Sequence, residues 1–124
     1  MSDDEKADEE IALAWINERN VRISTPGVHC GFDALDKICA QNPSRAVRIV
    51  QLICSKDSSD QIMQVLAAGP LENLLVKHGR QIIDQVEDAA RESPVFRELL
   101  EGVWQREMDA AVWQRVLTAR LKTS

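Results

Sequence analysis

The sequence is poor in the residues that usually carry catalysis, metal binding or membrane insertion. Its 124 residues include only three Cys and two His, and no apolar run approaches the roughly 18 residues of a membrane span. The N-terminus is acidic, whereas secretory and mitochondrial signals are basic. No glycine-rich phosphate loop occurs, and strand patterns are nearly absent. We therefore expect a cytoplasmic protein that uses no cofactor.

The few potential metal ligands are badly spaced for a metal site. Cys30, Cys39, Cys54, His29 and His78 include no pair with the separation of two to four residues that lets neighbouring ligands hold one zinc ion. An odd number of cysteines without an export signal favours free thiols in a reducing compartment. Cys39 and Cys54 each follow Ile in an apolar stripe, so we expect them in the core. No metal site and no catalytic residue are assigned.

Positive charge in excess is also lacking. The first ten residues carry six acidic side chains and one Lys, and the other 114 residues carry 14 acidic and 14 basic side chains. The whole net charge of −5 therefore lies in residues 1–10, and the remainder offers no basic surface for nucleic acid. The acidic run is interpreted either as a solubilising tail or first helical turn, or as an electrostatic lure for a basic partner.

What the chain does have is a recurring helical pattern. Residues 35–50 and 71–86 carry apolar side chains at matching positions, with a polar gap of equal length in each copy. Such spacing marks one face of an α-helix, and the matched gaps predict two equivalent helical hairpins. We expect an all-α fold, a compact bundle of helical hairpins that resembles armadillo or HEAT repeats. About eight helices are expected, in a single domain over residues 11–124 behind the acidic segment 1–10.

Prolines mark expected helix starts, because proline is tolerated at the first helical position. Three of them follow a residue that can cap or end a helix: Asn42 before Pro43, Gly69 before Pro70, and Ser93 before Pro94. Gly69 is expected to take a left-handed conformation that closes one helix, while Pro70 opens the next. Gly79 marks another stop, and the last helices are expected from Pro94 to about Arg106 and from Asp109 onward. The sequence of residues 21–28 predicts a short extended segment followed by a turn.

Several stretches together resemble one bacterial protein family. They are Leu66, Ala67, Ala68, Gly69, Pro70, Leu71, Glu72, Asn73, Leu74 and Leu75, then Lys77, His78 and Gly79, then Pro94, Phe96, Arg97, Leu99, Gly102, Val103 and Trp104, and finally Met108, Val112, Trp113 and Arg115. This pattern is similar to the family named domain of unknown function 6869. The resemblance implies an all-helical domain from a bacterial source, and it brings no activity with it.

Candidate functional residues cluster in the same part of the chain. The candidate binding residues are Glu72, His78, Trp104 and Arg106, and the structural turns are Gly69, Pro70 and Gly79. His78 is read either as a helix-end residue near free carbonyls or as a recognition residue. The three Trp side chains are read as core, with partial exposure at a groove as the alternative.

The expected function is non-catalytic protein binding, in the role of an immunity or regulatory protein. The expected partner is another protein, of basic character if the acidic segment acts as a lure, and neither nucleic acid nor membrane is expected. The alternative is a small enzyme or ligand-binding protein with a pocket near Glu72, His78 and Trp104. A buried Glu72 that faces a cavity would favour this alternative, whereas a Glu72 that only caps its helix would favour protein binding. The oligomeric state is left open.

Overall fold

The computed structural model describes residues 3–20, 30–105 and 107–121, and in this part of the chain all regular structure is helical. The elements are α1 (Asp3–Asn20), α2 (Cys30–Gln41), α3 (Pro43–Lys56), α4 (Asp60–Leu66), a π-helical turn (Ala67–Leu71), α5 (Glu72–Glu92), α6 (Pro94–Leu100) and α7 (Ala110–Leu121). The all-α prediction is confirmed. The extended piece expected at residues 21–28 lies outside the described residues.

Two of the three prolines open helices as predicted. The side chain of Asn42 accepts a hydrogen bond from the backbone N–H of Arg45 at 3.2 Å, and Pro43 begins α3. In the same way, the Ser93 hydroxyl accepts from the Phe96 N–H at 3.2 Å, and Pro94 begins α6. Both caps satisfy an N–H group that has no partner inside its helix.

Pro70 does not open a helix, and this prediction was wrong. Residues 67–71 form a π-helical turn, which we call the wide turn, and it joins α4 to α5 without a loop. Gly69 does not adopt a left-handed conformation. In a regular helix, the Pro70 ring would clash with the carbonyl of Leu66. The wider turn relieves this clash while Leu66 and Leu71 both stay fully buried, so burial keeps the helix continuous.

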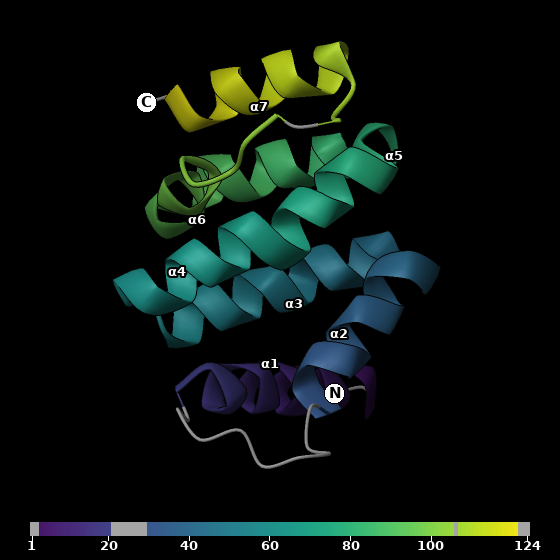
Figure 1. Ribbon diagram of the computed structural model, residues 1–124, viewed down its shortest axis with the longest axis vertical. Coiled ribbons are helices and arrows are strands. Elements are labelled where there is room, and N and C mark those ends of the chain that lie inside the picture. The colour runs from purple at the N-terminus through teal and green to yellow at the C-terminus, as the bar shows by residue number, and fades with distance from the viewer. Residues whose placement is uncertain (1–2, 21–29, 106, 122–124) are drawn as a thin grey trace.

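The break expected at His78 and Gly79 is a kink inside α5. His78 has φ −132° and ψ 21°, which are not helical values, so α5 consists of two arms. Figure 1 shows these arms running in different directions. The described residues thus form six continuous helical segments, and the expectation of about eight separate helices was wrong because residues 60–92 contain no loop.

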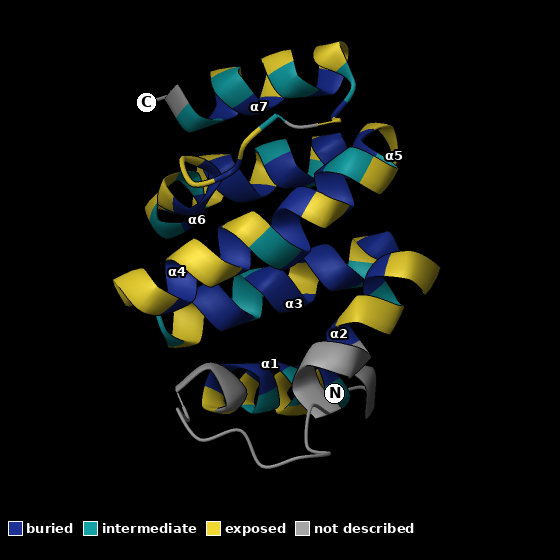
Figure 2. Cartoon of the chain, in the orientation of Figure 1, coloured by how far each residue is buried: buried dark blue, intermediate teal, exposed yellow. Residues whose placement is uncertain are grey.

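The helices stack along the long axis of the molecule, with α1 at one end and α7 at the other (Figure 1). α1 packs on α2 and α3, α3 packs on α5, and α5 packs on α7. Figure 2 shows that the buried residues lie on the faces turned toward neighbouring helices. Trp15 and Phe96 are the largest of the fully buried side chains. The apolar face of α3 is buried at Ala46, Val47, Val50, Ile53 and Cys54. Cys39 and Cys54 are free and buried, as predicted.

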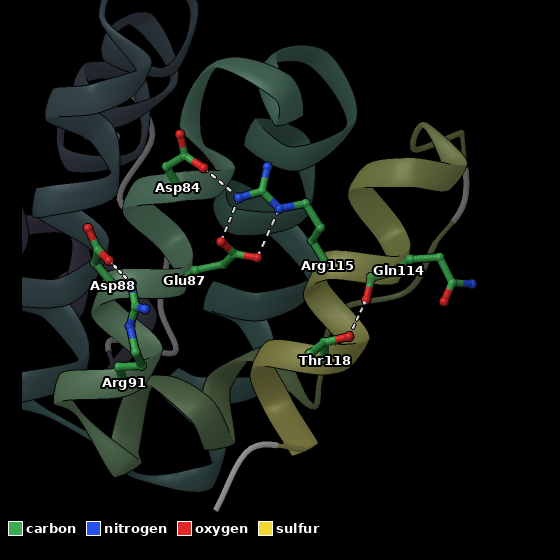
Figure 3. Close-up of polar contacts among 7 residues, drawn as sticks. All are labelled: Asp84, Glu87, Asp88, Arg91, Gln114, Arg115 and Thr118. Atoms are coloured by element: carbon green, nitrogen blue, oxygen red, sulfur yellow. Dashed lines mark hydrogen bonds and ion pairs between the residues drawn. The ribbon is translucent and has the colours of Figure 1, made fainter. Parts of the chain in front are cut away.

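Ion pairs fasten the terminal helix α7 to α5. From α7, Arg115 donates to both carboxylate oxygens of Glu87, at 2.9 and 2.6 Å, and to Asp84 at 2.5 Å (Figure 3). Arg91 pairs with Asp88 one turn farther along α5. Beneath these exposed pairs, Val112 and Val116 are buried. Since exposed ion pairs contribute little, the apolar contacts provide most of the stability of this layer.

The acidic N-terminal residues from Asp3 onward belong to α1 and join it without a break. Asp8 is only 4% exposed, and it accepts a hydrogen bond from the Arg45 Nε at 2.6 Å. Glu9 forms a longer, exposed pair with Lys56 at 3.7 Å. α1 is therefore attached to α3 through Asp8 as well as through its apolar face.

Candidate functional site

The candidate site lies between α6 and α7, at residues 101–105 and 107–109, which we call the Trp104 loop. Of the four candidate binding residues, Trp104 lies in this loop and Glu72 lies beside it at the start of α5. His78 lies at the α5 kink, and Arg106 lies outside the described residues. The helix expected to run from Pro94 to about Arg106 ends at Leu100, so Trp104 is a loop residue.

A buried carboxylate holds the backbone of this loop. Glu72 is only 3% exposed, and its Oε1 accepts a hydrogen bond from the backbone N–H of Trp104 at 3.0 Å. A hydrogen bond to a carboxylate is stronger than one between neutral groups. Glu72 therefore fixes the main chain at Trp104.

Close packing on the wide turn fixes the loop a second time. After α6, Gly102 and Val103 donate to the carbonyls of Leu99 and Leu100, each at 3.1 Å. A Cβ atom on Gly102 would lie 2.9 Å from the Cβ of Ala67, so only glycine allows the loop to approach the wide turn this closely. Two stretches of the family pattern, residues 66–75 and 102–104, therefore meet in space.

The Trp104 side chain is exposed, although the apolar residues Val103 and Met108 of the same loop are buried. Trp104 is 70% exposed, whereas Val103 is 2% and Met108 is 4% exposed. The expectation that tryptophans are core residues holds for Trp15, which is 1% exposed, and Trp113 is partly buried against the core. For Trp104 the core prediction is wrong, because its side chain is exposed. The loop thus presents a large apolar ring on a backbone that is held at Gly102 and at Trp104.

His78 belongs to a different place on the surface. A shallow pocket of about 320 Å³ at the α5 kink is lined by residues that include His78, Arg80 and Asp109 but neither Glu72 nor Trp104. Arg80 donates to Asp109 at 2.7 Å and, together with the Ala111 backbone N–H, holds the pKa of that carboxyl below its usual range. Gly79 is needed here, because a Cβ atom would lie 2.8 Å from Val112 Cγ1. The predicted trio of Glu72, His78 and Trp104 is therefore not assembled into one pocket.

The described cysteines are poor nucleophiles. Burial raises the pKa of both Cys39 and Cys54 from 9.0 to about 11, with the carboxylate of Asp36 adding to the effect at Cys39. The reactive thiolate form is therefore scarce at neutral pH. Among the side chains that the structure describes, no three of His, Cys, Asp or Glu lie together in a way that would hold a metal ion. None of the described helices has the length and apolarity needed to cross a bilayer.

Sequence reasoning missed the role of Asp8, although a signal was present. Ala12, Trp15 and Ile16 form the buried face of α1, and Asp8 precedes Ala12 by one helical turn on that same face. A carboxylate at a core-facing position indicates a buried partner, because an unpaired charge there is costly. The partner, Arg45, lies 37 residues away in sequence and was not identifiable from local pattern.

Comparison with known proteins gives a family but no activity. A family model described as "Family of unknown function (DUF6869)" matches residues 30–124, a range that leaves α1 outside. Searches of curated proteins and of solved structures found no match. The matched range covers the wide turn, Glu72 and the whole Trp104 loop, and extends over more than half of the sequence. The chain therefore belongs to the DUF6869 family of unknown function.

Proposed function

We propose that the protein is a non-catalytic protein-interaction module that binds its partner through Trp104. The observation that carries this proposal is the 70% exposure of Trp104 on a loop whose backbone is held by the buried Glu72. Tryptophan is enriched among the residues that dominate binding at protein interfaces. The loop that carries this one is fixed in place before any partner arrives.

The energetics support a role in binding. Burying an exposed indole of roughly 200 Å² contributes about 5 kcal/mol at about 25 cal/mol per Å². A flexible loop would lose part of this gain in ordering its backbone on binding. Here the contacts of Glu72 and of Gly102 have already ordered it within the folded protein. These contacts hold the loop in place while the Trp104 side chain itself stays outside the core.

Further details of the proposal extend what the sequence indicates. The helices are proposed to form stacked hairpins of the armadillo or HEAT kind, supported by the matched spacing of residues 35–50 and 71–86. We propose a cytoplasmic, bacterial protein with an immunity or regulatory role, in which it occupies a toxin or an enzyme. The net charge of −5 in residues 1–10 supports a basic partner.

The alternative of an enzyme or small-ligand protein receives less support. Glu72 already accepts a hydrogen bond from the loop backbone, and His78 lines a pocket that does not include it. A general acid or base must lie within hydrogen-bond reach of the group on which it acts. We therefore favour protein binding over this alternative, since His78 lines a pocket that includes neither Glu72 nor Trp104.

The experiment compares the tagged protein with two variants in affinity purification from cells of the source organism. Trp104→Ala removes the proposed anchor. Leu13→Ala is the matched control, because Leu13 is also a large apolar residue that is exposed, at 48%, and it lies on α1. We expect a protein that is retained by the wild type and the control and lost with Trp104→Ala. Retention by all three forms to the same degree, or by none, would contradict the proposal.

Once that protein is identified, titration calorimetry with purified components gives the size of the effect. Truncation of a central Trp anchor should weaken the affinity on the order of a hundredfold, which is the range of interface hot spots. A gene for a toxin beside the gene for this protein would support the immunity role specifically. An affinity that is unchanged by Trp104→Ala would show that contact is made elsewhere.

A further inference from the structure

Helix α1 is an addition to the family domain. It lies at one end of the stack of helices (Figure 1) and packs on α2 and α3. The family model matches residues 30–124, a range that begins at the first residue of α2 and leaves α1 outside. α1 therefore covers a face that the family domain itself provides.

Few side chains hold α1 in place. Among the α1 side chains that the structure describes, the buried apolar ones are Ala12, Trp15 and Ile16. The shorter helix α3 buries seven residues. Because the free energy of local opening rises with the number of buried apolar contacts, α1 should open at a lower cost than α3.

The largest of these side chains does not fill its seat. A pocket of about 40 Å³ borders Trp15 and is lined by residues of α2, of the wide turn and of the start of α5. On the wide turn, a Cβ atom added to Gly69 would meet nothing within 4 Å. Side-chain atoms beside a space that the protein leaves unfilled lack packing partners on that side. The Trp15 ring is therefore held less firmly than its burial suggests, and the seat has room for other side chains.

An ion pair with a buried carboxylate adds to this attachment. Asp8 of α1 is 4% exposed and accepts a hydrogen bond from the Arg45 Nε of α3 at 2.6 Å. On α1 this carboxylate is followed by a small residue four positions later, and by bulky apolar residues seven and eight positions later. Arginine keeps its charge at any ordinary pH, so a helix that replaces α1 must bring its own carboxylate to Arg45.

We propose that α1 opens from the family domain as a unit, and that the uncovered face of α2, α3 and the wide turn binds a helix of a partner protein. The partner helix carries the pattern of α1, with an acidic residue for Arg45 and bulky apolar residues for the seat of Trp15. Regularly spaced anchors of this kind are a common way for a helix to dock on another protein. α1 then acts as an internal competitor that keeps the face covered until the partner helix displaces it. This surface is distinct from the Trp104 loop and does not depend on what that loop binds.

The test supplies α1 as a separate molecule to the full chain. A labelled peptide with the sequence of residues 3–20 is titrated with the protein, and binding is followed by fluorescence anisotropy. In the Asp8→Ala protein the attached α1 loses its contact with Arg45, whereas the peptide keeps its own carboxylate. We expect this variant to bind the peptide about thirtyfold more tightly than the wild type, because its face is uncovered for a larger fraction of the time. A helix with only a structural role would give no such gain.

Control variants locate the effect. Leu13→Ala, at an exposed position of α1, should bind the peptide as the wild type does. Trp104→Ala should also leave binding unchanged, so failure of the proposed function and failure of this proposal can be told apart. A peptide that carries Trp15→Ala should bind at least about tenfold more weakly. Asp8→Asn keeps an oxygen acceptor for Arg45 and should give a smaller gain of the same sign, and circular dichroism melting checks the fold of each variant.

Amide hydrogen exchange of the unmodified full chain tests the opening directly. The amides of Ala12, Trp15 and Ile16 should share one opening equilibrium. The open state should be at least about a hundredfold more populated than the one that exposes Val50 and Ile53 of α3. Equal opening constants in the two helices would overturn the proposal, since α1 would then leave only when the whole protein unfolds.

Other results would overturn it as well. They are the absence of saturable peptide binding to the Asp8→Ala protein, equal binding by this variant and the wild type, and equal binding of the peptide with Trp15→Ala. A dimer of the free protein in which two copies exchange α1 would also overturn it, because a second copy of this chain would then occupy the face.

Discussion

Adding a single methyl group at Gly79 should force the α5 kink and α7 apart. A Cβ atom at this position would lie 2.8 Å from Val112 Cγ1, 3.1 Å from its Cγ2 and 3.3 Å from its Cβ. Both residues are buried, so no single rotation of the Val112 side chain removes all three contacts. Overpacking of a core costs about 1–3 kcal/mol, and replacing a helical Gly by Ala returns up to about 1 kcal/mol. We expect Gly79→Ala to lower the free energy of unfolding by about 1–2 kcal/mol.

A double-mutant cycle separates this contact from other effects. Val112→Ala removes two buried methyl groups and should cost about 2 kcal/mol by itself. In the combined variant the new methyl group at position 79 occupies the space that Val112 leaves. The cost of the pair should therefore fall below the sum of the single costs by at least about 1 kcal/mol. Urea unfolding followed by far-UV circular dichroism measures all four forms. Additive costs, or a Gly79→Ala variant as stable as the wild type, would refute the reasoning.

Three further predictions follow from the same structure. Gly69→Ala should change the free energy of unfolding by less than about 0.5 kcal/mol in urea melts, because Gly69 is not left-handed, and the gain from Ala in a helix is offset by Pro70, which disfavours helical backbone angles for the residue before it. Asp8→Ala should lower the free energy of unfolding by about 2 kcal/mol, because it leaves Arg45 without its buried carboxylate partner. Glu9→Ala removes an exposed ion pair and should change the melting temperature little. Burial raises the pKa of Cys39 and Cys54 to about 11, so the protonated thiols stabilise the fold below pH 9.0, and the free energy of unfolding should fall as pH rises from there toward 11. Stability unchanged over that pH range would show that the two thiols are not buried in solution.

Local rules predicted the features that local interactions control. Caps and prolines placed the starts of α3 and α6, since an N-cap side chain bonds an N–H only three residues away. The prediction that tryptophans are core residues likewise holds for Trp15 on α1. In these cases the packing of distant segments agrees with the preference of the sequence.

Prediction failed where distant contacts overrule local preference. Pro70 lies inside a helix because Leu66 and Leu71 are buried on one core, and a wide turn costs less than exposing either. Trp104 lies in a loop because Gly102 meets Ala67 and Glu72 binds the backbone, contacts that join residues about 30 positions apart. Glu72 and Trp104 were both selected from the sequence, but their connection through a backbone hydrogen bond was visible only in three dimensions.

The wide turn has a consequence for how the length of related sequences can vary. A π-helical turn accommodates one more residue than an α-helical turn, and each residue rotates an α-helix by about 100°. The extra residue in Ala67–Leu71 therefore keeps the buried stripe of α4, at Ile62 and Leu66, in phase with that of α5, at Leu74. Deleting Pro70 would leave a regular helix with both stripes still facing the core. The same deletion elsewhere in α4 or α5 would turn one stripe toward solvent, so single-residue gaps between family members should collect at this turn.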